Sequence, residues 1–197
     1  TIQTGYSFRR RLEVTLHGEL SVIQMKDLQD DNTVNLDNLS KIDLIEIKKH
    51  HLAQKGDLIF RSRGFATTSA ILLKDPGKAI IAAPLLRIRV KDSKIVLPEY
   101  LNWYMSQNEA QKFFTSRALG SIHKMINLQT IENLEIILPD LKTQKTIIEL
   151  EELTHEDSII VLMGDHYGIS DYHNRAMATY LDKDEITPFD HIQLQRV

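Results

Sequence analysis

The hydrophobic pattern changes its period at Pro98, and this change constrains the fold more than any other feature of the sequence. Before Pro98, short apolar runs of strand length are separated by turn residues. From Pro98, a favoured first residue of a helix, apolar side chains recur at helical spacing to about Thr115. Strands followed by helices predict an α+β fold. The strand-length runs lie at residues 58–60, 69–73, 79–83 and 85–90.

The other predicted elements extend this arrangement on both sides. An opening β segment is expected within residues 12–28, followed by a polar loop over 29–41. A short helix or turn over 128–133 leads to a strand over 134–138, which Pro139 ends. A second long helix is expected over 141–153. The chain then changes character near Thr154, and a further strand is expected over 157–163.

The composition is that of a soluble globular protein. The 197 residues include 42% hydrophobic residues, enough for one core and a small second unit. The chain has no cysteine, which excludes disulfides and thiolate metal sites and fits a reducing cytosol. No apolar run reaches the roughly 18 residues of a membrane span. The sequence starts at Thr1 without a signal-peptide pattern, which leaves open whether the natural N-terminus lies upstream.

The charge is distributed unevenly along the chain. Residues 1–142 carry a net charge of +4 and residues 143–197 a net charge of −7, which together give the overall −3. A basic body with an acidic tail is compatible with a nucleic-acid reader that has an appendage. Chance variation in surface charge would give the same numbers.

Three basic clusters stand out as candidate DNA contacts. Arginine can pair with guanine or phosphate, and hydroxyls and glycine N–H groups favour phosphate. A solvated loop or a basic helix end would account for each cluster equally simply. The predicted DNA-binding residues are Arg9, Arg10, Arg11, Arg61, Arg63, Thr67, Thr68, Ser69, Arg117, Ser121, His123 and Lys124.

The part of the chain before Thr154 shows no sign of catalysis. It has no phosphate-binding loop, no dinucleotide fingerprint, no Ser/His/Asp constellation and no methyltransferase tetrapeptide. The pair His50-His51 lacks a third ligand at suitable spacing, and adjacent side chains on a strand would point to opposite faces. The first part is therefore predicted to be a binding module without cofactors.

A set of short motifs occurs in a characteristic order over residues 1–153. It includes Gly5-Tyr6-Ser7-Phe8-Arg9, the segment 55–64 (KGDLIFRSRG), Pro98-Glu99-Tyr100-Leu101, and residues 138–147 (LPDLKTQKTI). In this order they resemble the specificity subunits of type I restriction–modification systems. In that family, a strand ending in proline passes through a glutamine-containing turn into a long helix, as residues 138–147 do here.

The resemblance implies a mixed, β-rich target-recognition domain over residues 1–140 and a spacer helix over 141–155. It implies double-stranded DNA, methyltransferase subunits and restriction subunits as partners, with no membrane association. Family members often carry two recognition domains, so a chain with one would pair with a second copy of itself through the spacer helix. The predicted helix of about 13 residues is short for an independent coiled coil.

The C-terminal segment, residues 156–197, has a different resemblance. The stretch 157–170 (DSIIVLMGDHYGIS) and the segments 173–177 and 193–197 are similar to the sulfatase-like domain of lipoteichoic acid synthases, which are manganese-dependent phosphoglycerol transferases. Asp165 and His166 match two metal ligands of that family. The other ligands and the nucleophile would lie upstream, where this chain has the recognition-domain pattern, so no functional metal site is expected. A strand and helix without their parent sheet are expected to pack poorly or to be partly disordered.

Together with the lack of catalytic motifs, the first resemblance implies a cytoplasmic, non-catalytic specificity subunit that directs methyltransferase and nuclease subunits to a DNA sequence. Two alternatives remain open at this point. One is a fragment of a manganese-dependent phosphoglycerol transferase. The other is a protein-docking module that does not bind DNA on its own.

Overall fold

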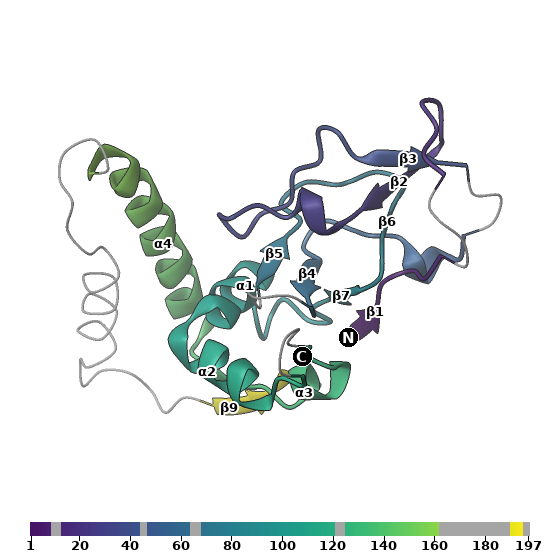
Figure 1. The fold of residues 1–197 in the computed structure, drawn as a ribbon. Coiled ribbons are helices and arrows are strands. Elements are labelled where there is room, and N and C mark those ends of the chain that lie inside the picture. The colour runs from purple at the N-terminus through teal and green to yellow at the C-terminus, as the bar shows by residue number, and fades with distance from the viewer. Residues whose placement is uncertain (9–12, 44–46, 64–67, 121–124, 162–189, 195–197) are drawn as a thin grey trace, which may run out of the picture.

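A computed structural model of the chain confirms the α+β class. It describes residues 1–8, 13–43, 47–63, 68–120, 125–161 and 190–194, with side chains omitted for 153–161 and 190–193. A four-stranded and a three-stranded sheet lie together, and a third sheet has two strands. Three helices gather beside the four-stranded sheet, and a long helix, α4 (Leu141–Val161), extends away from the sheets (Figure 1). None of the helices described is long and apolar enough to cross a membrane.

The larger sheet has four strands in the order β1-β7-β4-β5, and every neighbouring pair is antiparallel. Strand β7 alternates as its sequence predicts. Its Leu86 and Ile88 enter the core shared with the helices, whereas Arg87 faces the other side. The strands are β1 (Ile2–Thr4), β4 (Leu58–Arg61), β5 (Ser69–Ile71) and β7 (Leu85–Ile88).

The smaller sheet has three strands in the order β3-β2-β6, with β2 and β6 parallel. The β segment expected within residues 12–28 covers only β2, because a 3-10 helix, η1, begins two residues after it, and β1 precedes it. A cis peptide bond between Ala83 and Pro84 connects β6 to β7. The elements are β2 (Leu20–Ile23), η1 (Met25–Asp27), β3 (Ser40–Ile42) and β6 (Ala79–Ile81).

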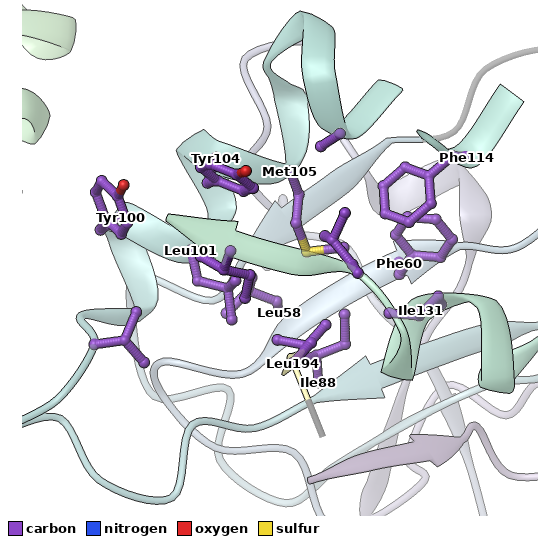
Figure 2. Close-up of a cluster of buried hydrophobic side chains, with 14 of the residues drawn as sticks. Leu58, Phe60, Ile88, Tyr100, Leu101, Tyr104, Met105, Phe114, Ile131 and Leu194 are labelled. Carbon is purple, nitrogen blue, oxygen red and sulfur yellow. The ribbon is translucent and has the colours of Figure 1, made fainter. Parts of the chain in front are cut away.

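The helix predicted from Pro98 to Thr115 is divided into two. Gln107 takes an extended conformation and ends α1 (Pro98–Ser106), and α2 (Asn108–Arg117) starts immediately after it. The apolar faces of both helices cover the larger sheet. Figure 2 shows Leu101, Met105 and Phe114 meeting side chains of β4 and β7 in this core.

Among the last elements, the long helix α4 differs from its predicted bounds. Helix α3 (Leu128–Glu132) and strand β8 (Glu135–Leu138) lie where they are expected. Helix α4 (Leu141–Val161) continues eight residues beyond the predicted end, so the strand expected from residue 157 is wrong for residues 157–161. The expected boundary between spacer and C-terminal segment, at 155/156, therefore falls inside one helix.

Residues 190–194 pack against the elements described above. Strand β9 (Asp190–Gln193) pairs antiparallel with β8, and Leu194 is buried in the core beside α3 and β7. Residues 190–194 are thus part of the packed domain. Residues 162–189, on which the prediction of poor packing also rested, lie outside the described residues.

Candidate nucleic-acid interface

Two of the predicted basic clusters meet at the end of β4. Arg63 forms an antiparallel bridge with Met125, which also bridges Leu119, and the N–H of Ile126 donates to the carbonyl of Ser62 at 2.9 Å. The strand end is thereby joined to the chain that follows α2. Segments far apart in the sequence thus contribute arginines to one region of the surface.

The arginines of this region differ in their surroundings. Arg63 is exposed. Arg61 is half-buried, and its Nη2 donates to the carbonyl of Met25 at 3.3 Å while its buried Nε has no hydrogen-bond partner. Arg117, at the end of α2, is exposed, and its guanidinium carbon lies 3.9 Å from the ring centre of Phe113. Its Nη1 also donates to the hydroxyl of Ser116 at 3.1 Å, so the stacking leaves the rest of the guanidinium edge for an anion.

These arginines are not neutralised by carboxylates within the part of the chain that the structure describes. The ion pairs found there are Lys78–Glu19 and Arg89–Asp57, and neither involves a residue of the β4 end. Among those residues, no carboxylate therefore lies at ion-pair distance from Arg61, Arg63 or Arg117. Such a surface attracts phosphate electrostatically.

The prediction for Ser69 requires a correction. Its side chain is only 3% exposed, and its hydroxyl donates to Oδ1 of Asn102 at 2.9 Å. The amide of Asn102 in turn donates to the carbonyl of Asn32 at 3.2 Å. Ser69 thus links β5 to α1 inside the fold and is not at the surface. Thr68, next to it, is half-buried.

Several predicted site residues lie outside the described residues. They are Arg9, Arg10, Arg11, Thr67, Ser121, His123 and Lys124, together with the metal-ligand candidates Asp165 and His166. Arg63 directly precedes residues 64–67, and Met125 directly follows residues 121–124. The described bridge is therefore where both of these segments attach.

The His50-His51 pair does not lie on a strand. It belongs to a 3-10 helix, η2 (Lys49–His51), and the two rings are 4.1 Å apart between centres. The premise that these side chains point to opposite faces is wrong. Among the described residues, no group of three or more His, Cys, Asp or Glu could hold a metal ion.

A buried arginine on β7 was not among the predicted site residues. Arg87, on β7, is 7% exposed and lies behind His50 and His51. The only signal in the sequence is the alternation of Arg87 and Arg89 with apolar residues. That alternation shows that the arginines share a face, but it cannot show which segment covers them.

Comparisons with known proteins show the family and the fold of this chain. The model of the type I restriction modification DNA specificity domain matches residues 1–156. The HsdS subunit from Thermoanaerobacter tengcongensis shares the fold, with a TM-score of 0.57 at 18% identity over 71% of this chain and 37% of that chain. The type-I restriction-modification system S subunit from M. genitalium gives a TM-score of 0.53 at 11% identity over 79% of this chain and 36% of that chain.

Short matches to a second kind of protein accompany these. Lipoteichoic acid synthase-like YvgJ from Bacillus subtilis is 66% identical over 47 residues, which are 24% of this chain and 8% of that protein. Lipoteichoic acid synthase 2 from the same organism is 65% identical over 43 residues, 22% of this chain and 7% of that protein. The chain thus spans less than half of the solved structures and under a tenth of these relatives.

The family match covers most of the chain, and the fold similarity extends over more than two thirds of it. The chain therefore belongs to the family of type I restriction modification DNA specificity domains.

Proposed function

We propose that this chain recognises a DNA sequence as the specificity subunit of a type I restriction–modification system. The observation that carries the proposal is the junction of Arg63 with Met125. There, the exposed Arg63, two residues after β4, and the exposed Arg117, the last residue of α2, have no carboxylate partner in the part of the chain that the structure describes. A positive surface alone would fit any polyanion. Membership in the family is the reason for choosing DNA as the ligand in this proposal.

The arginines have separate roles in this proposal. Arg63 and Arg117 are exposed and have flexible side chains, so they contact phosphates or guanine edges. Arg61, which is half-buried, supports the strand end by donating to the carbonyl of Met25. The remaining candidates for phosphate contact are Arg9, Arg10, Arg11, Thr67, Thr68, Ser121, His123 and Lys124.

The proposal includes the partners that act on the recognised site. The chain has no catalytic role in it, and the methyltransferase and restriction subunits supply the chemistry in the cytoplasm. Residues 1–140 form the recognition domain. Helix α4, with 21 residues and a length of about 31 Å, acts as the spacer and offers a surface to a second copy of the chain.

A salt-dependent binding assay tests the proposal. In filter binding to duplex DNA, we expect affinity to fall steeply as salt rises, because each neutralised phosphate releases counterions. Arg63→Ala should weaken binding about 5- to 10-fold or more, in line with the loss of one charge-assisted contact. Lys112→Ala, which removes an exposed charge on α2, is the matched control and should have a smaller effect.

The possible results separate the proposal from its alternative. Absence of binding at low salt, or binding without a salt slope, contradicts independent DNA recognition. Binding that requires added methyltransferase subunits favours the docking module, which would contact DNA only inside the assembly.

A further inference from the structure

Leu119 is a large apolar side chain that stays exposed beside the arginines of the candidate interface. Its side chain is 52% exposed. Within the described residues, it joins none of the buried apolar clusters or the side chains packed against them. Single exposed leucines are common on protein surfaces, so exposure alone does not identify a site. What distinguishes Leu119 is its fixed position relative to Arg63.

Backbone hydrogen bonds hold Leu119 in place. Its N–H donates to the carbonyl of Met125, and its carbonyl accepts from the N–H of Met125, both at 2.9 Å. A pair that exchanges both bonds is the smallest unit of an antiparallel two-stranded ribbon. Gly120 has a φ of 95°, a left-handed conformation that favours glycine, so the chain turns directly after Leu119. Leu119 is therefore held where this ribbon begins to turn.

Met125 also places Leu119 on the same face as Arg63. It forms one antiparallel bridge with each of them. Residues that are directly paired across antiparallel strands project their side chains to the same face. At a strand spacing of about 4.8 Å, the backbones of Leu119 and Arg63 are about 10 Å apart, with Met125 between them. One face thus presents an exposed apolar side chain close to an exposed cation.

From the exposure of Leu119, its fixed backbone and the face that it shares with Arg63, we propose that Leu119 reads a thymine methyl group in the major groove of DNA. The inference rests on the function proposed above, which supplies DNA as the ligand. Among the four unmodified bases, thymine alone carries an apolar group at the major-groove edge, and this groove admits a two-stranded ribbon. Arg63 contacts a phosphate or a guanine edge beside it. The contact removes both the leucine and the methyl group from water.

Replacing thymine by deoxyuridine removes only this methyl group and gives a direct test. The full chain first selects its preferred sequence from random duplexes, and each thymine of that sequence is then replaced in turn. At one position, we expect the affinity of the wild type to fall about 3- to 5-fold, the amount expected for one buried methyl group. Leu119→Ala should bind the thymine and deoxyuridine duplexes within about 1.5-fold of each other.

Leu73→Ala is the matched control, because Leu73 is 49% exposed and follows β5. Strands β4 and β5 are antiparallel, with Leu58 paired to Ile71, so Leu73 lies beyond the opposite end of β4 from Arg63. This variant should keep the full preference for thymine over deoxyuridine.

The results separate this inference from the function on which it rests. The inference is overturned if no thymine of the selected sequence responds in the wild type. It is also overturned if Leu119→Ala keeps the preference, or weakens binding to both duplexes equally, because the leucine then acts elsewhere than at the methyl group. A selected sequence that Arg63→Ala still binds more weakly shows in these cases that only the role of Leu119 has failed. Selection of no sequence at all rejects both proposals.

Discussion

At the scale of single residues, the hydrogen bonds of Gln144 explain why a glutamine follows the proline that ends β8. Its side chain is fully buried. Its Oε1 accepts from the N–H of Leu97 at 2.9 Å, and its Nε2 donates to the carbonyls of Ile95 and Pro139 at 3.0 and 2.8 Å. One amide thus ties the start of α4 to the segment that precedes α1.

Replacing this amide should destabilise the domain strongly. Gln144→Ala leaves the N–H of Leu97 and two carbonyls without these partners and removes a fully buried side chain, so we expect a loss of about 2–4 kcal/mol in the free energy of unfolding. Urea denaturation measures it as a lower midpoint with an unchanged slope. Gln129→Ala, at an exposed position of α3, is the matched control and should change stability by less than about 0.5 kcal/mol. Equal effects of the two variants would contradict the bonding described for Gln144.

The resemblance of residues 138–147 to the family pattern pointed to this glutamine. The prediction that Ser69 binds DNA was wrong for a physical reason. The glutamine belongs to a local strand–turn–helix pattern, which the printed order of residues displays. The burial of Ser69 depends on Asn102, 33 residues away, and on Asn32, which approaches from a loop. From the sequence alone, a hydroxyl in a basic segment is expected to be exposed. Only the three-dimensional structure shows that a helix covers it. Local residue chemistry therefore predicts candidates, and tertiary contacts select among them.

At the scale of elements, two tyrosines join α1 to β8. The hydroxyl of Tyr100 donates to the carbonyl of Ile137 at 2.7 Å, and that of Tyr104 donates to the carbonyl of Glu135 at 3.2 Å. Burial, with a smaller contribution from Tyr104, raises the pKa of Tyr100 above its usual value. The folded state therefore prefers the neutral phenol, which is the form that donates the hydrogen bond.

This preference makes stability depend on alkaline pH. The contribution of Tyr100 is present below the unfolded-state pKa of about 10 and is lost as pH rises from there through the higher pKa of the folded state. Tyr100→Phe should cost about 1 kcal/mol at pH 8. The stability gap between wild type and variant should then narrow above pH 10, measured by urea midpoints at pH 8 and 11. A gap that stays constant or widens would show that the phenol does not titrate as described.

The pairing of β9 with β8 gives a second element-scale prediction. Leu194, which follows β9, is 2% exposed and lies near Leu58, Ile88 and Ile131 in the core (Figure 2). Leu194→Ala should cost about 2–4 kcal/mol of unfolding free energy, as expected for a buried leucine. Leu73→Ala, at a position 49% exposed, is the matched control and should cost less than about 1 kcal/mol. An equally small cost for Leu194→Ala would mean that the chain end does not belong to this domain.

Elements with a strong local period were predicted well, and those made by distant pairing were not. The apolar runs over 58–60 and 85–90 and the helical spacing after Pro98 correspond to β4, β7 and the α1–α2 pair. Strands β1 and β9 have only three and four residues, and each takes its partner from a remote part of the chain. Neither segment, IQT or DHIQ, contains an apolar run like those of β4 and β7, so the sequence alone does not indicate a strand there. The resemblance of the last residues to another kind of protein also gave no reason to expect them in this core.

At the scale of the whole molecule, the acidic charge of residues 143–197 opposes the function proposed for the basic first part. The net −7 of this region repels a polyanion over distances of about a Debye length, which is roughly 10 Å at 0.1 M salt and 30 Å at 0.01 M. Replacing Asp182, Asp184 and Glu185 by Asn, Asn and Gln removes three of these charges without changing side-chain size. We expect non-specific DNA affinity to rise about two- to threefold at 0.01–0.05 M salt and to change little at 0.15 M, where screening is stronger. Filter binding at both salt concentrations measures this, with Asn174→Gln as a charge-neutral control in the same region. An increase that persists unchanged at 0.15 M would mean that these carboxylates act by contact with the DNA-binding surface, and not through the field of the whole chain.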